Sequence, residues 1–212
     1  SSLSGQFIWS LTVTDAFSGW TENRAFLGKS ADATLSAIIS INNGLPYTVH
    51  SYNVDNGTEF LNRYFVEYFE GIKSISLTRS RAYRKNDNCH VEQKNFTHVR
   101  EYFGYERYDR EELAKYMNEI YIEYLNPLLN FFTPQLKLQE KSRVGSKYTR
   151  KYDKPKTPYH RLMESRQLSS KQKHDLTRQY EALNPIQLKK ELSRKISNFK
   201  KITETIYINK IS

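Results

Sequence analysis

VDNGTEF, the stretch from Val54 to Phe60, ends a run of strand-forming residues with an aspartate and follows it at once with Asn-Gly. Asn-Gly supplies the positive φ angles of a tight turn, so Asp55 has an ordinary explanation as a turn residue. It also has a functional explanation, because an aspartate at the carboxyl end of a strand can hold a cationic ligand. Which explanation holds depends on the other residues that the fold brings within reach of Asp55.

The hydrophobic pattern around this stretch predicts alternating strands and helices. Period-two alternation predicts a strand within 6–20, an antiparallel return at 21–27, and strands at 47–54 and 72–77. Helical spacing predicts a helix from Ser30 to Gly44, one over 58–70 closed by Gly71, one starting near Asn88, and one over 110–125 stopped by Pro127. This order predicts an α/β fold in which a mixed sheet is flanked by helices.

The composition changes after the last of these helices. Residues 129–168 are rich in Gln, Lys, Arg and Pro and predict an extended basic arm. Residues 169–212 predict a helical C-terminal extension, with Ser169 or Ser170 capping one helix and Asn184-Pro185 starting the next. We expect the last helix to pack on the rest of the chain, with self-pairing or partner binding as the alternative. The expected division is therefore a core at 1–128, the arm and the extension.

The charge is divided unevenly along the chain. The net charge is +10, and residues 134–212 carry 20 Lys and Arg against 7 Asp and Glu, whereas residues 1–133 carry 13 against 16. A basic half attached to a near-neutral half favours binding to a polyanion, most often nucleic acid. The alternative is a solvated basic tail that aids solubility.

Other global features exclude several classes of protein. No apolar run is long enough for a membrane span, and Ser1–Ser10 lacks the pattern of a signal peptide. Cys89 is the single cysteine, which excludes an internal disulfide and favours a reducing compartment.

Two carboxylates are the candidates for a metal site. Asp55 follows one strand, and Glu92 lies early in the helix after the next strand, with 36 residues between them. A strand, turn and helix of that total length can bring the two acids together at one edge of the sheet. Converging carboxylates suit Mg²⁺ or Mn²⁺, and two such ions can clamp the oxygens of a phosphoryl transfer. The alternative is that Asp55 and Glu92 are ordinary solvated acids.

The residues around Glu92 favour the functional explanation. The preceding loop is basic and would neutralise phosphates around an acidic pocket. Its cations are Arg79, Arg81, Arg84 and Lys85. Asn95 lies three residues after Glu92, on the same side of the expected helix, where it could orient a metal-bound water or contact a phosphate.

These strings together resemble the catalytic core of DDE transposases and integrases, the group that includes retroviral integrases and bacterial insertion-sequence transposases. The resemblance covers about the first 165 residues. It rests on TDAFSGWTE (Thr14–Glu22), VDNGTEF, RSRAYRKNDNCHVEQKN (Arg79–Asn95), LNFFTPQLKL (Leu129–Leu138) and KYDKPKTPYHRLM (Lys151–Met163). The last two strings are similar to segments that follow the core in a bacterial branch.

The resemblance implies a ribonuclease H-like fold, with Asp55 as the second catalytic carboxylate and Glu92 as the third. It further implies two Mg²⁺ or Mn²⁺ ions, DNA as partner in the form of transposon ends and target, and a homo-oligomer that joins two ends. The implied location is the bacterial cytoplasm, on the nucleoid, without a membrane.

The chain departs from the family pattern at the first catalytic aspartate. The family places that residue on a strand before TDAFSGW, and Ser1–Phe7 contains no acid. The chain begins after it, the reading frame is truncated, or Asp15 substitutes for it, although Asp15 is better explained as a turn residue before Ser18-Gly19. Without that strand, the remaining strands would leave an unpaired edge.

Three functions therefore remain open from the sequence. The first is DNA transposition or integration, by metal-dependent phosphodiester cleavage and strand transfer. The second is a catalytically incomplete DNA-binding remnant of a transposase. The third is a ribonuclease H-like nuclease that cleaves but never joins ends.

Overall fold

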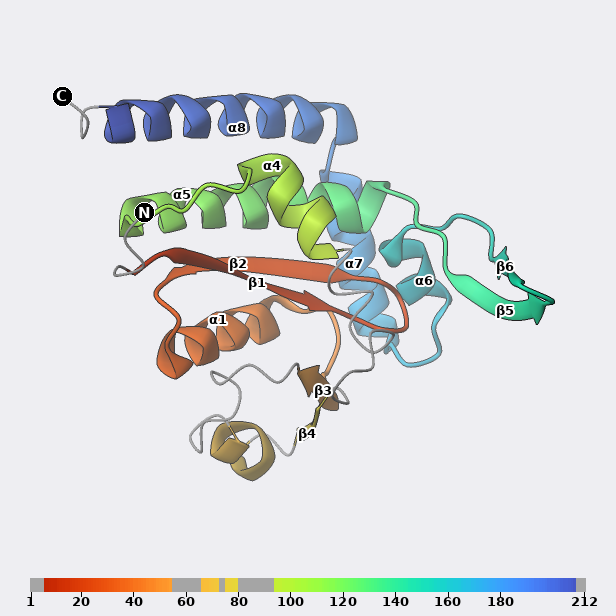
Figure 1. Cartoon of the computed structure of the whole chain (residues 1–212). Coiled ribbons are helices and arrows are strands. Elements are labelled where there is room, and N and C mark those ends of the chain that lie inside the picture. Colours follow the sequence, from red (N-terminus) through yellow and green to blue (C-terminus); the bar gives the residue numbers. More distant parts are fainter. Residues whose placement is uncertain (1–5, 55–65, 73–74, 80–93, 209–212) are drawn as a thin grey trace.

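The computed structural model describes residues 6–54, 66–72, 75–79 and 94–208. The fold is mixed α/β, and Figure 1 shows its layers, in which α8 covers α4 and α5, these cover the β1–β2 hairpin, and α1 lies on the hairpin's other face. The strands are β1 (Ile8–Thr14), β2 (Thr21–Leu27), β3 (Ser51–Val54), β4 (Ser76–Arg79), β5 (Leu138–Val144) and β6 (Lys147–Tyr152). The α-helices are α1 (Ala31–Gly44), α4 (Glu101–Phe103), α5 (Glu111–Ile120), α6 (Pro158–Glu164), α7 (Ser170–Ala182) and α8 (Pro185–Ile208). Wider, π-helical turns are Glu67–Ile72, Phe96–Arg100, Tyr121–Leu125 and Leu128–Phe132.

The described strands form separate pairs. β1 and β2 are antiparallel, β3 and β4 are parallel, and β5 and β6 are antiparallel. Within the described ranges β2 is the one strand that pairs with β1, and the Ile8 N–H at the start of β1 donates to the Tyr108 carbonyl at 2.7 Å. A single mixed sheet of ribonuclease H type stays a prediction.

The β1–β2 hairpin and the helix after it confirm the first sequence predictions. The strands are joined through a turn in which Gly19 takes a φ of 80°, a conformation that glycine adopts without strain. Ser30 caps α1, since its hydroxyl accepts a hydrogen bond from the Ala33 N–H at 3.1 Å, and α1 ends at Gly44 as predicted.

β2 is buried although its sequence is polar. Its residues Thr21, Glu22, Asn23, Arg24 and Ala25 are all buried. Two asparagines cover the edge of β2 that faces away from β1. Asn130 accepts from the N–H of Thr21 and donates to its carbonyl, both at 2.9 Å, and Asn118 does the same for Ala25 at 2.7 and 2.8 Å. The amides thus replace a neighbouring strand and satisfy backbone groups that burial would otherwise leave unpaired.

We expect Asn130→Ala to lower the free energy of unfolding by about 2–4 kcal/mol, because the buried N–H and carbonyl of Thr21 then lose the hydrogen bonds that Asn130 makes to them. Urea denaturation monitored by circular dichroism would measure this loss. Asn43→Ala, at an exposed position near the end of α1, is the matched control and should change stability by no more than about 0.5 kcal/mol. Equal effects of the two substitutions would show that the Thr21 edge does not depend on Asn130.

The predicted strand boundaries around the parallel pair need correction. The strand predicted over 47–54 begins only at Ser51, and the strand predicted from Ile72 begins at Ser76. Gly71 does not close the preceding helix, which continues to Ile72. A glycine ends a helix when the next turn needs a positive φ, and Gly71 has none.

The prediction that Pro127 stops a helix is wrong. Helical backbone continues through Pro127, which has a φ of −58°, to Phe132. The turn before it is π-helical, and the Asn126 N–H bonds to the carbonyl of Tyr121, five residues back. We attribute the continuation to this wider turn, which eases the clash between a proline ring and the carbonyl four residues back. The helix therefore carries Asn126 and Asn130 along β2.

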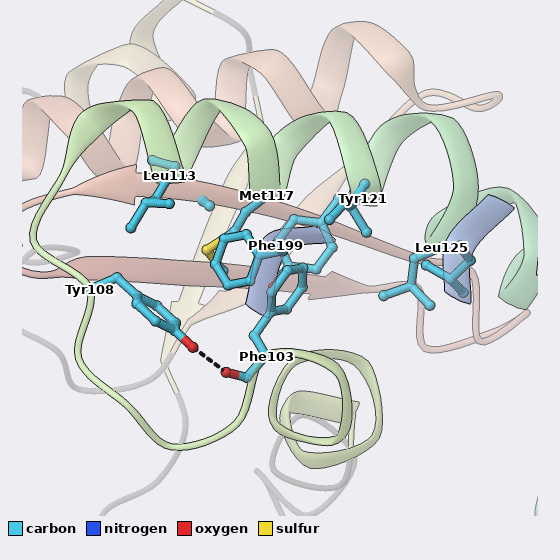
Figure 2. Packing of buried hydrophobic residues seen from close by; sticks show 11 residues of the cluster. Phe103, Tyr108, Leu113, Met117, Tyr121, Leu125 and Phe199 are labelled. Carbon is cyan, nitrogen blue, oxygen red and sulfur yellow. Dashed lines mark hydrogen bonds between the residues drawn. The ribbon is translucent and has the colours of Figure 1, made fainter. Parts of the chain in front are cut away.

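The largest core cluster lies between β2, α5 and α8 (Figure 2). Phe103, Leu113, Met117, Tyr121 and Phe199 are buried in it. The Tyr108 hydroxyl donates to the Phe103 carbonyl at 2.8 Å, which closes the loop before α5. The prediction that the last helix packs on the rest of the chain is thus confirmed.

The segment predicted as an extended arm contains more structure than expected. Residues 138–152 form the β5–β6 hairpin, with Gly145 at a φ of 63° in its turn, and α6 follows. A ribbon without an apolar face gives no hydrophobic alternation, so the sequence pattern did not reveal it. Ser169 then caps α7 in a capping box with Gln172, as the sequence predicts. The division at residues 128 and 168 stays a prediction. None of the helices in the described ranges combines the length and apolar character needed to span a bilayer.

Candidate functional site

The parallel strands β3 and β4 place two predicted site segments at one edge. Val54 lies opposite Arg79, so both strands end side by side. Asp55 directly follows Val54, and the predicted basic loop begins at Arg79. Asp55, Arg81, Arg84, Lys85 and Glu92 lie outside the described residues, as does the side chain of Arg79. Asp55 and Glu92 as metal ligands therefore stay a prediction, and among the described residues no group of three or more His, Cys, Asp or Glu side chains could hold a metal ion.

Asp15 belongs to the turn between β1 and β2. Its Oδ2 accepts hydrogen bonds from the Ser18 N–H at 2.7 Å and from the Ser18 hydroxyl at 2.5 Å. The backbone of Asp15 also pairs with Trp20 and Gly19. These bonds are those of a turn aspartate, and they engage one carboxylate oxygen that a metal would need. Substitution of Asp15 for the first catalytic aspartate stays a prediction.

The described part of the helix near Glu92 begins at Lys94, close to the turn that contains Asp15 and Gly19. The Lys94 ammonium donates to the side-chain Oε1 of Gln135 at 2.7 Å. The same Oε1 lies against Gly19, where an added Cβ would come within 2.8 Å of it. Burial lowers the pKa of Lys94 to about 8. Segments from three distant parts of the sequence thus meet at Gln135.

Two further cations surround the segment that carries Gln135. The Lys137 ammonium donates to the Ala16 carbonyl at 2.6 Å and also to the Phe17 carbonyl. Arg161 donates to the Gln135 carbonyl at 2.8 Å and to the carboxylate of Asp153 at 2.5 Å. Bonding to Arg161 lowers the pKa of Asp153. The base of the β5–β6 hairpin is therefore fixed to the Asp15 turn by charged hydrogen bonds.

Asn95 lines a groove of about 690 Å³ between its helix and the start of β1. Trp9, Lys29 and Arg100 line the same groove, and the Lys29 ammonium lies 5.0 Å from the centre of the Trp9 ring. The groove is open to solvent, and its lining has three cations, Lys29, Arg100 and Arg107, against one acid, Glu106. This excess of positive charge suits contact with an anion. That Asn95 and Glu92 face the same side stays a prediction.

A buried ionic network inside β2 was not anticipated from the sequence. The Glu22 carboxylate accepts from Trp20 Nε1 at 3.0 Å, from Asn126 Nδ2 at 2.8 Å and from Arg24 Nη1 at 3.2 Å. Burial raises the pKa of Glu22, and the charge of Arg24 opposes this shift. Two charged residues in a short polar strand were the only sequence signal of this network. Asn126, which also donates to Glu22, lies about a hundred residues later in the chain.

His98 extends this network toward the helix after Glu92. Its Nδ1 lies 3.4 Å from Asn23 Nδ2, and the Asn23 amide donates to Asn126 at 2.9 Å. Burial lowers the pKa of His98 to about 3, so it is neutral at physiological pH. The network links Asn126, β2 and the helix that carries Lys94 and Asn95. Buried polar groups satisfied in this way hold neighbouring elements in one arrangement.

Comparisons with known proteins show limited similarity. No family model matches the chain. An uncharacterized protein, y4rM, of Sinorhizobium fredii (strain NBRC 101917 / NGR234) is 32% identical over 157 residues, which are 74% of this chain and 44% of the relative. The chain thus spans less than half the length of that curated relative. The catalytic core domain of BIV integrase aligns with a TM-score of 0.44 and 19% identity, over 73% of this chain and 84% of that chain.

Proposed function

We propose that the chain is the core of a DDE transposase or integrase, which carries out DNA transposition or integration by metal-dependent cleavage of a phosphodiester and strand transfer. The proposal includes a ribonuclease H-like fold, assembly as a homo-oligomer, and a location on the bacterial nucleoid. Transposon ends and target DNA are the proposed partners.

The observation that carries the proposal is the parallel register of β3 and β4. It sets Val54 opposite Arg79, so the residue that precedes the candidate ligand Asp55 lies beside the start of the basic loop that leads to Glu92. Ligands of α/β folds collect where parallel strands end. Two of the sequence strings that resemble those of the family begin at Val54 and Arg79, the residues that lie at this edge.

Each proposed site residue has a distinct role. The oxygen donors of Asp55 and Glu92 suit Mg²⁺ or Mn²⁺, and together with a first aspartate, which Ser1–Phe7 does not contain, they would hold two ions. Such ions would activate water and then a DNA 3′-hydroxyl for in-line attack. Asn95 would contact a phosphate near the scissile bond. The loop cations would neutralise the DNA backbone. These are Arg79, Arg81, Arg84 and Lys85.

A plasmid-nicking assay tests the proposal. The whole chain should nick supercoiled DNA in the presence of Mn²⁺, and EDTA should abolish this nicking. Asp55→Asn and Glu92→Gln should each reduce nicking to background. Asp32→Asn and Glu112→Gln make the same chemical changes at exposed positions of α1 and α5 and should nick as the wild type does. Nicking that survives both Asp55→Asn and Glu92→Gln would refute the proposed ligands.

The second candidate function is the DNA-binding remnant. The bonds that tie Asp15 Oδ2 to Ser18 favour it, because they engage the one acid considered as a substitute for the first catalytic aspartate. A remnant would bind DNA without cutting it in either metal. A nuclease without strand transfer would nick the plasmid but leave a labelled 3′-end unjoined to target DNA.

A further inference from the structure

The β5–β6 hairpin exposes charged and aromatic side chains far from any core. It projects from the body beside α6 (Figure 1), and every residue of β6 is exposed. Tyr148 and Tyr152 are 54% and 47% exposed. The hydrophobic clusters formed by the described residues contain no residue of β5 or β6. Packing within the chain therefore does not explain why these tyrosines are present.

The strand register divides the hairpin into two unlike faces. Lys141 lies opposite Arg150, and Arg143 lies opposite Tyr148. Since alternate residues of a strand share a face, one face, here called the Tyr148 face, is basic and aromatic. It carries Lys141, Arg143, Tyr148, Arg150 and Tyr152. The Lys141 ammonium lies 4.6 Å and the Arg143 guanidinium 5.8 Å from the centre of the Tyr148 ring, which agrees with this division.

The opposite face, here called the Lys147 face, has a different chemistry. It carries Glu140, Ser142, Lys147, Thr149 and Lys151. Its two lysines are partly offset by one carboxylate, whereas the Tyr148 face has three cations and no acid. The asymmetry points to a polyanion that contacts one side of the ribbon.

The base of the hairpin is held in a fixed direction. The backbone of Gln135 pairs with that of Lys156, with N–H to carbonyl distances of 2.9 and 3.3 Å, and Asp153 accepts from both the Lys137 N–H and Arg161. Gln135 also accepts from Lys94, at the start of the helix that follows Glu92. A polymer bound along the hairpin would therefore be held in a fixed direction relative to the segment that carries Lys94.

We propose that the hairpin lies in the major groove of duplex DNA with its Tyr148 face against the DNA. This rests on the proposed function for the identity of the polymer as DNA. A two-stranded β-ribbon fits the major groove of B-form DNA, about 12 Å wide, whereas the deep, narrow major groove of A-form RNA excludes it. Arg143, Arg150 and Lys141 contact phosphates, and the tyrosines cover sugar and base edges.

Fluorescence anisotropy with a labelled duplex in EDTA tests the proposal independently of catalysis. Arg143→Gln with Arg150→Gln removes two charges from the Tyr148 face, and Lys147→Gln with Lys151→Gln removes two from the opposite face. The first pair should weaken binding at least about tenfold and reduce the slope of log K against log salt by about 2, as expected for two lost phosphate contacts. The second should change affinity by less than about threefold.

Tyr148→Leu separates aromatic contact from charge. It should weaken binding by about fivefold or more while leaving the salt slope unchanged. If both double variants lost the same affinity for DNA, or if neither lost any, the proposal that the Tyr148 face contacts the DNA would be wrong. Tighter binding of single-stranded DNA or duplex RNA than of duplex DNA would overturn the groove assignment. If only the Tyr148-face variant loses affinity and the chain does not nick DNA, the proposed function is refuted but the DNA contact of the hairpin is not. If the chain nicks DNA and both double variants bind as the wild type does, the DNA contact of the hairpin is refuted but the proposed function is not.

Discussion

Replacing Arg24 with methionine is expected to lower the free energy of unfolding by about 3–5 kcal/mol near neutral pH, the range for removing one partner of a buried ion pair. Arg24 and Glu22 are both buried within β2, and Arg24 Nη1 lies 3.2 Å from Glu22 Oε2. Without Arg24, the Glu22 carboxylate stays buried beside Trp20 and Asn126 and loses its ion-pair partner. The Asn23 carbonyl also loses a donor at 2.8 Å.

This loss should depend on pH in a defined direction. Burial already raises the pKa of Glu22 in the folded protein, and removing Arg24 raises it further. A raised folded pKa means that the group favours folding below its unfolded value of about 4.3, and this contribution disappears as pH rises through the folded pKa. The deficit of Arg24→Met relative to wild type should therefore be larger at about pH 7.5 than at about pH 5, measured by urea denaturation.

The control removes both charges together. Glu22→Gln combined with Arg24→Met should recover most of the stability, since no unpaired buried charge remains. Arg194→Met, at an exposed ion pair of α8, should cost no more than about 1 kcal/mol. An Arg24→Met deficit that is equal at both pH values and persists in the double variant would mean that lost packing is responsible, rather than the charge.

Local signals predicted several elements of the fold correctly because their causes are local. Ser30, Ser169 and Asn184 cap their helices through hydrogen bonds to residues two or three positions along the chain. The alternation of apolar and polar residues from Phe7 to Val13 predicted β1, and the turn residues after it predicted the antiparallel strand β2, because both strands belong to one hairpin. Such patterns need no knowledge of the tertiary structure.

Predictions that depend on tertiary contacts were less successful. A proline usually ends a helix, but the π-helical turn at Tyr121–Leu125 lets the chain continue through Pro127. The polar sequence of β2 does not indicate burial, because Asn118, Asn126 and Asn130 supply its partners from about a hundred residues away. A sequence pattern shows whether a residue is polar, but it does not show whether a distant amide will form hydrogen bonds with that residue's polar groups.

For the candidate site, the sequence supplied the acids and the structure supplied part of their surroundings. Spacing and resemblance singled out Asp55, Glu92 and the loop cations. The register Val54 to Arg79, the contact of Lys94 with Gln135 and the turn bonds of Asp15 come from the structure. No local pattern contained the junction at Gln135, because it joins segments near residues 19, 94 and 135.

Truncating Phe199 to alanine is expected to lower the free energy of unfolding by about 3–5 kcal/mol, because it removes a fully buried ring and leaves a cavity. The ring makes edge contacts with Phe103 and Tyr108, with centroids 5.2 and 5.1 Å away, and stacks on Tyr116 at 6.1 Å. These partners belong to α4, α5 and the loop between them, so Phe199 fixes α8 on that layer (Figure 2). Thermal and urea denaturation would measure the loss.

A second measurement tests whether α8 detaches from the core in this variant. Limited proteolysis should cleave Phe199→Ala within α8 faster than wild type, since a loosened helix opens more often. Ile186→Ala, at a side chain 80% exposed in the first turn of α8, is the control and should change stability by no more than about 0.5 kcal/mol. If Phe199→Ala lost no more stability than Ile186→Ala and resisted protease equally, α8 would not be held by the aromatic cluster, and its apolar face would have to be buried by another contact.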